Sequence, residues 1–195
     1  WDLSIPGQYS TQKDAFSNLW VTSTQRYDYQ QLTIMAQGIV EIDPKCEVAL
    51  QDCAIHPSVF LQPTSMTECN REMLAFAHEY VTDKTREELQ LLAAAILQYI
   101  PYCSQVTEVH TPATEVFNAH QQGGVCQDHS HVFIAMCRAL GIPARYVSGY
   151  LYAPDMLHLA SHAWAEVYLD QTWYCFDISN SKLSFGFSLL LGTLS

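Results

Sequence analysis

Basic residues are scarce in this chain, and long apolar runs are absent. Lys and Arg account for 9 of the 195 residues against 20 Asp and Glu, which gives a formal net charge of -11. Such a chain repels the phosphates of nucleic acids and anionic lipid head groups, so we expect no nucleic-acid and no membrane partner. A bilayer-spanning helix needs about 20 consecutive apolar residues, and no stretch of the sequence reaches that length.

Paired cysteine motifs and a visible secretory signal are also lacking. The seven cysteines are an odd number, and none belongs to a CxxC pair, unlike the dense, even framework of a small secreted domain. No charged segment followed by an apolar segment opens the chain, as a secretory signal would. These absences predict a cytoplasmic location.

What the sequence does contain is enough apolar material for one globular unit. About half of the residues are hydrophobic, so the chain can bury a core. Residues 32–36 and 39–42 are rich in side chains that suit strands, and they predict a small β region. We therefore divide the chain into an N-terminal β region, 1–62, and a catalytic core, 63–195.

Helix signals begin at residue 63. The run from Ser65 to Glu68 fits a capping box and predicts a helix to about residue 81. A second box, from Thr85 to Glu88, opens a helix with an apolar stripe that Pro101 ends. A short helix begins at Thr111-Pro112 and is ended by the two glycines at 123 and 124.

A central helix and a group of strands follow. Residues 126–140 carry a continuous apolar stripe closed by Gly141, which predicts a buried helix. Three strand candidates follow, at 145–152, 162–169 and 172–177, and Asp170-Gln171 forms a two-residue turn between the last two. This order predicts an α+β fold in which the central helix packs on an antiparallel sheet.

Cys126 is the candidate nucleophile because of its position in the sequence. It follows two glycines and begins a helix, where unsatisfied N–H groups and the helix dipole stabilise a thiolate. Gly124 lets the backbone approach a substrate closely, and the N–H of Cys126 can donate to an oxyanion. Cys137 lies in the apolar stripe instead, where burial keeps a thiol protonated.

A reactive cysteine needs a base and a group that orients the base. His131 lies five residues along the same helix, too close in sequence to sit beside Cys126 on one face, whereas His162 begins a strand and can point at a helix terminus. Asp177, near the end of the following strand, can accept a hydrogen bond from His162. A lone cysteine is usually a core residue. The prediction of a catalytic site therefore depends on finding Cys126, His162 and Asp177 together in this order.

The hairpin register decides whether the base and the carboxylate can meet. With Asp170-Gln171 as the turn, Leu169 pairs with Thr172, and His162 and Asp177 become diagonal neighbours on one face. A register shifted by one residue would send Asp177 to the opposite face. We expect that opposite face to be apolar and buried.

Four segments of the chain form a recognisable set. They are GVCQDHSH (124–131), RALGIPARYVSGY (138–150), HAWAEVY (162–168) and WYCFD (173–177). Together they resemble the bacterial transglutaminase-like superfamily, whose members are often described as cysteine proteases, and the resemblance is strongest from about residue 63 to residue 177. It implies a papain-like core with Cys126 as nucleophile, His162 as base and Asp177 as orienting carboxylate, and an N-terminal β region, 1–62, that is only partial.

Other polar and aromatic residues receive smaller roles. Trp164 is a candidate wall of the substrate cleft. Asp128 and His131 are expected to be structural. The histidines at 120, 129 and 131 do not have the spacing of common Cys/His zinc sites around Cys126, so we expect no metal ligands and no cofactor.

These observations predict acyl transfer through a thioester on Cys126, with hydrolysis of a peptide or amide bond as the outcome. Amine transfer onto glutamine uses the same thioester and remains an alternative. A catalytically silent peptide-binding module is a second alternative. The apolar tail, 185–194, suggests a third, a structural or partner-binding protein.

Overall fold

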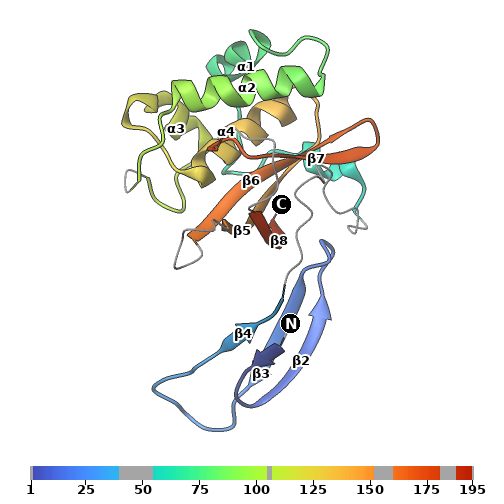
Figure 1. The fold of residues 1–195 in the computed structure, drawn as a ribbon, viewed down its shortest axis with the longest axis vertical. Coiled ribbons are helices and arrows are strands. Elements are labelled where there is room, and N and C mark those ends of the chain that lie inside the picture. Colours follow the sequence, from blue (N-terminus) through green and yellow to red (C-terminus); the bar gives the residue numbers. More distant parts are fainter. Residues whose placement is uncertain (1, 40–54, 105–106, 152–159, 181–187, 195) are drawn as a thin grey trace.

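The computed structural model describes residues 2–39, 55–104, 107–151, 160–180 and 188–194. Its centre is a four-stranded antiparallel sheet with the strand order β7-β6-β5-β8. The strands are β5 (Ala144–Leu151), β6 (Ala160–Leu169), β7 (Thr172–Phe176) and β8 (Ser188–Leu194). The helices gather on one side of this sheet, and the N-terminal strands lie on the other (Figure 1). The predicted helix-on-sheet arrangement is confirmed.

The central helix, α4 (Cys126–Ala139), is buried from Asp128 to Arg138. It packs between the sheet and three further helices, α1 (Arg71–His78), α2 (Arg86–Tyr99) and α3 (Ala113–Asn118). Gly141 follows its end with a φ of 74°, the left-handed conformation that glycine adopts without strain. This enclosure holds the N-terminus of α4, and with it Cys126, in a fixed position.

One predicted helix start is confirmed and one is wrong. The capping box at Thr85 and Glu88 opens α2 as expected. The helix predicted from residue 65 begins only at Arg71, where the side chain of Asn70 accepts a hydrogen bond from the N–H of Met73 at 2.8 Å. Inside the predicted first turn, the hydroxyl of Thr67 instead accepts from the N–H of Thr64 at 3.1 Å, and the chain forms a loop there.

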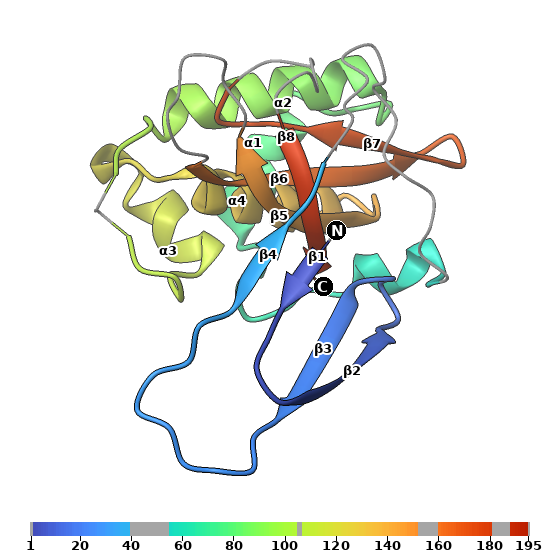
Figure 2. The same ribbon diagram turned by 60° about the horizontal axis from the view of Figure 1, so that its bottom comes forward.

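The N-terminal region forms two small antiparallel ribbons. β1 (Asp2–Ser4) pairs with β4 (Met35–Gln37), and β2 (Gln8–Lys13) pairs with β3 (Leu19–Thr24). Sequence analysis missed β1 to β3 and predicted a longer strand where β4 lies; most of 39–42 lies outside the described residues. Figure 2 shows the ribbons projecting from the sheet. The division of the chain at residue 62 stays a prediction.

The C-terminal tail contributes a strand to the main sheet. β8 pairs with β5 in an antiparallel register from Tyr146 opposite Leu194 to Leu151 opposite Ser188. The register shifts between Ser148 and Gly149, which marks a β-bulge. The described part of the tail thus extends the main sheet, and the alternative of a structural or partner-binding protein stays a prediction.

The hairpin of β6 and β7 has the predicted register. Leu169 lies opposite Thr172, and Asp170 and Gln171 have φ values of 47° and 63°, as a two-residue hairpin turn requires. The face that was expected to be apolar packs against α4 through buried side chains, which include Ala165, Val167 and Phe176. That part of the prediction is confirmed.

The opposite face of the hairpin is also buried, which the sequence did not predict. A second cluster covers it, in which a short 3-10 helix, η1 (Pro57–Leu61), contributes the central ring. Phe60 meets Trp173 edge-on at a centroid distance of 5.2 Å, and Phe16 of the N-terminal region packs on Phe60 at 6.0 Å. The cluster consists of Phe60, Val147, Trp164, Trp173 and Cys175.

Within the described ranges, no helix is both long and apolar enough to cross a membrane. The five cysteines that the structure describes are free thiols: Cys69, Cys103, Cys126, Cys137 and Cys175. The cytoplasmic location stays a prediction.

Candidate active site

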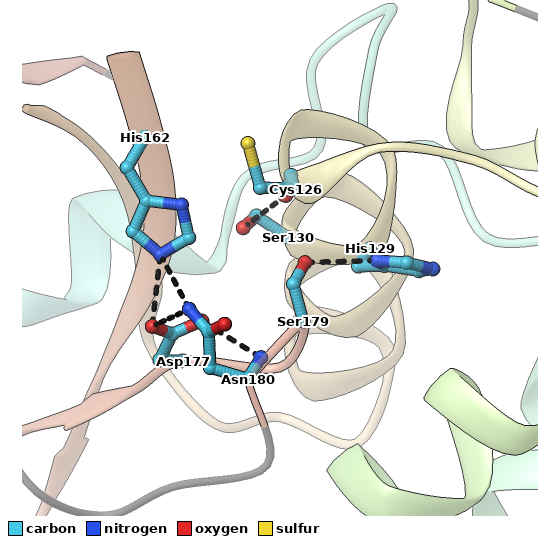
Figure 3. Close-up of polar contacts among 7 residues, drawn as sticks. All are labelled: Cys126, His129, Ser130, His162, Asp177, Ser179 and Asn180. Carbon is cyan, nitrogen blue, oxygen red and sulfur yellow. Dashed lines mark hydrogen bonds and ion pairs between the residues drawn. The ribbon is translucent and has the colours of Figure 1, made fainter. Parts of the chain in front are cut away.

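Cys126 is the first residue of α4 and is partly exposed. The N–H of a first helical residue has no acceptor within its own helix, so this N–H can meet an oxyanion at the sulfur. Figure 3 shows the Cys126 sulfur projecting toward the side of the site that His162 occupies. By contrast, burial raises the pKa of Cys137, which keeps that thiol protonated.

Close packing explains why residue 124 is a glycine. Its N–H donates to the carbonyl of Pro101 at 3.0 Å, and its carbonyl accepts from the N–H of Cys103 at 2.9 Å. A Cβ placed on Gly124 would lie 3.0 Å from the Cβ of Asp128, closer than most Cβ contacts in proteins. Glycine therefore permits the close approach of helix and loop, and its contact with substrate stays a prediction.

Asp128 braces the start of α4, as its expected structural role requires. Its Oδ2 accepts from the N–H of Val125 at 2.8 Å and from the hydroxyl of Thr107 at 2.6 Å. A carboxylate at this position also interacts favourably with the positive end of the helix dipole. The residue before Cys126 is thereby tied to the first turn of the helix.

His162 and Asp177 meet as predicted. His162 Nε2 lies 2.8 Å from Asp177 Oδ2, and the other ring nitrogen, Nδ1, faces Cys126 (Figure 3). Burial lowers the pKa of His162, but hydrogen bonds to Asp177 and Cys126 and the negative charges of both outweigh it and raise the pKa to about 9. The imidazole is therefore protonated at neutral pH, where it stabilises an adjacent thiolate.

Asn180 is a site residue that sequence reasoning missed. Its side-chain amide donates to Asp177 Oδ2 at 2.7 Å and lies 3.4 Å from His162 Nε2, and its backbone N–H reaches Asp177 Oδ1 at 3.3 Å. The sequence signal available was an aspartate at the end of a strand, whose carboxylate often accepts from backbone N–H groups that follow it. Asn180 holds the carboxylate that holds the imidazole.

The two helix histidines near Cys126 are held by other groups. Both ring nitrogens of His129 have protein partners, Ser179 Oγ at 2.9 Å and the carbonyl of Ile100 at 2.8 Å. His131 packs on Tyr146 with a ring separation of 5.0 Å, and burial lowers the pKa of His131 to about 4. Across the described residues, no three His, Cys, Asp or Glu side chains are grouped as metal ligands.

Trp164 lies beside His162 but beneath the surface. Its ring is 6.1 Å from the His162 ring, and the residue is 4% exposed within the cluster that Phe60 covers. It therefore supports the base from behind. Its predicted part in substrate binding stays a prediction.

A buried ion pair lies further along the same face of β6 and was also missed. Arg145 Nε donates to Glu166 Oε2 at 2.7 Å, and the guanidinium stacks 4.3 Å from the Trp173 ring centroid. Burial raises the pKa of Glu166, while the charge of Arg145 opposes the shift. The pair links β5 to β6, the strand that carries His162.

Comparisons with known sequences identify the family of this chain. The family model of the transglutaminase-like superfamily matches residues 74–178, which is more than half of the chain. An uncharacterised protein of Mycobacterium tuberculosis is 30% identical, over 91% of this chain and 65% of its own length. One of Mycobacterium leprae is 29% identical, over 88% of this chain and 67% of its own length. The chain thus spans about two thirds of these relatives.

A solved structure shares the fold. It is the crystal structure of "a Putative Cysteine Protease" from Cytophaga hutchinsonii, which matches with a TM-score of 0.66 over 98% of this chain and 69% of that chain, at 20% sequence identity. At this identity the match shows the fold alone, and it confirms the predicted α+β, papain-like transglutaminase architecture. By sequence and by fold, this chain belongs to the transglutaminase-like superfamily.

Proposed function

We propose that the chain is a thiol-dependent acyl-transfer enzyme that hydrolyses a peptide or amide bond through a thioester on Cys126. The observation that carries the proposal is the 2.8 Å contact between His162 Nε2 and Asp177 Oδ2, with Nδ1 of the same ring facing Cys126 at the start of α4. This arrangement supports the proposal of Cys126 as nucleophile, His162 as base and Asp177 as orienting carboxylate.

The first half of the reaction forms the thioester. The Cys126 sulfur attacks the substrate carbonyl while its proton resides on His162 Nδ1, and the backbone N–H of Cys126 donates to the developing oxyanion. The carbon–nitrogen bond then breaks, and the leaving amine takes the proton from His162. Asp177 accepts a hydrogen bond from Nε2 throughout, which keeps the ring oriented.

The second half releases the acyl group. His162, now neutral, accepts a proton from water, and the hydroxide adds to the thioester carbonyl. The carbon–sulfur bond breaks, the acid leaves, and the proton returns to the Cys126–His162 pair. A primary amine that attacks the same thioester would give amine transfer instead, so both outcomes share the residues named here.

A peptide library incubated with the protein, with and without a primary amine, tests the proposal by mass spectrometry. We expect cleaved peptides from the unaltered protein and none from Cys126→Ala. The matched control is Cys103→Ala, which removes another exposed thiol and should leave cleavage intact. Amine-modified glutamine without cleavage would establish transfer rather than hydrolysis, and binding without either product would establish a silent peptide-binding module.

A further inference from the structure

A pocket along α4, lined from Gln127 to Arg138, has no part in the chemistry proposed above. Its volume is about 230 Å³, below the roughly 300–1,000 Å³ of sites for drug-sized ligands. It is therefore of a size for one side chain rather than for a length of peptide. The residues that line it include Met66, Val109, Gln127, His131, Arg138 and Tyr146.

The pocket adjoins Cys126 through two elements. Gln127, the next residue along α4, lines it, and the Gln127 side chain donates to the carbonyl of Val109 at 2.8 Å. Tyr146 lines it from β5. Burial, and then the negative charges of Cys126 and Asp128, raise the pKa of Tyr146 to about 12. A side chain in this pocket would thus belong to a residue near the bond under attack.

The wall of the pocket along α4 carries its positive charge on Arg138, because His131, with a pKa of about 4, is neutral at physiological pH. His131 lies four residues after Gln127, and Arg138 lies eleven residues after it. Both spacings are close to whole helical turns, so the three residues share one helix face. Arg138 lies on this face near the end of α4, and Gln127 lies near its start. The positive charge of Arg138 acts on His131 and lowers the pKa of that ring, in addition to burial.

Arg138 is a buried charge whose bonds in the described chain all go to neutral acceptors. Nε donates to the carbonyl of Ala144 at 3.0 Å, and Nη1 donates to the carbonyl of Gln62 and the hydroxyl of Thr67, both at 2.9 Å. Arg138 is 7% exposed. Of its five N–H donors, these bonds leave the two on Nη2, and none of the ion pairs among the described residues includes it.

His131 offers a second polar group in the same wall. The residue is 9% exposed, and its Nδ1 is buried without a hydrogen-bond partner among the described residues. Buried charges are usually paired and buried polar atoms usually hydrogen-bonded. The charge of Asp128 also acts on His131. Asp128 Oδ2 accepts from Val125 and Thr107, and its Oδ1 has no hydrogen-bond partner among the described residues.

We propose that this pocket binds an acidic side chain of the peptide substrate, with the carboxylate at Arg138 and His131 and the methylene groups against Met66 and Tyr146. The inference rests on the proposed function, because it names the substrate of the same site. The net charge of -11 does not oppose it, since charges beyond a Debye length of about 8 Å are screened at physiological ionic strength. The guanidinium of Arg138, which lines the pocket, therefore determines the preference for an acidic side chain.

Peptides that differ at one position by Glu, Gln or Met test the inference, because these side chains are close in size and differ in charge and polarity. We expect kcat/KM at one position near the scissile bond to be about tenfold or more higher for Glu than for Gln, as a charge-assisted hydrogen bond predicts. The Kd of the Cys126→Ala protein for the same peptides should show the same order. This second measurement tests the pocket without requiring catalysis.

A matched pair of variants locates the preference. Met66→Glu places a carboxylate in the pocket from within and should abolish the preference for Glu, whereas Met66→Gln, of the same size, should retain it. Cleavage with equal kcat/KM for Glu and Gln at every position would overturn the inference and leave the proposed function standing. Binding of Glu peptides by Cys126→Ala without cleavage by the unaltered protein would uphold the pocket and overturn the function. A Glu preference that survives Met66→Glu would also overturn the pocket assignment.

Discussion

Replacing Asp177 by Asn tests whether the carboxylate sets the charge of His162. The pKa of His162 is raised from its ordinary 6.5 to about 9, with burial acting in the opposite direction. The causes that raise it all come from Asp177 and Cys126. We therefore expect the pKa of His162 to fall in Asp177→Asn, and to fall below 6.5 in the double variant with Cys126→Ala, where burial is left unopposed.

The same shift has a consequence for stability. A raised pKa stabilises the fold fully below 6.5, and the stabilisation disappears as the pH rises through about 9. A difference of about 2.5 units, at 1.36 kcal/mol per unit, corresponds to about 3 kcal/mol. The unaltered protein should lose roughly this much free energy of unfolding between pH 6 and pH 9.5, and Asp177→Asn should lose much less.

Two measurements check this reasoning. NMR titration of the imidazole reports the pKa of His162 directly, and urea unfolding at both pH values reports the stability difference. The matched control is Asp170→Asn, the same substitution at the exposed hairpin turn, which should leave both quantities unchanged. If His162 titrates at the same pH with and without Asp177, the carboxylate does not orient or charge the base.

Four further predictions concern single residues. Cys126→Ala should abolish activity and leave thermal stability nearly intact, whereas Leu92→Ala, a fully buried position, should lower the free energy of unfolding by about 2–5 kcal/mol; a loss of similar size in Cys126→Ala would contradict the site assignment. At mildly acidic pH, mass mapping should find Cys126 alkylated before the exposed Cys103, because the imidazolium of the neighbouring histidine stabilises the thiolate. Asn180→Ala should lower kcat roughly tenfold, the value of one hydrogen bond to a charged group, and alter the pH–rate profile; an unchanged profile would reduce Asn180 to a structural role. Glu166→Gln leaves a buried guanidinium unpaired and should cost about 3–5 kcal/mol in urea unfolding, and a neutral result would show that the pair is dispensable.

The residues of the predicted triad could be found from sequence because local rules govern each of them. A glycine pair before an apolar stripe places Cys126 at a helix start, and a two-residue turn specifies which residues of a hairpin share a face. The register of Leu169 opposite Thr172 follows from that turn, and the contact of His162 with Asp177 follows from the register. No long-range information was needed for these steps.

The helix start predicted at Ser65 failed for a reason that local rules do not contain. The hydroxyl of Thr67 also accepts from Arg138, which is 71 residues away in the chain, and this contact helps to hold the segment as a loop. Asn70 then supplies the cap. The strands β1 to β3 were missed because their residues are nearly all exposed, so the sequence has no apolar alternation that would mark them.

The sequence by itself determined the fold class, the central helix and the pairing of His162 with Asp177, since periodicity, capping and turn chemistry act between near neighbours. Tertiary structure decided what surrounds those groups. It covered the hairpin with Phe60, placed Asn180 against Asp177, and brought Arg138 and Tyr146 to one pocket. Burial and the pairing of charges depend on segments that meet only in the folded chain, and these contacts decide the pKa of His162 and the character of the pocket beside Cys126.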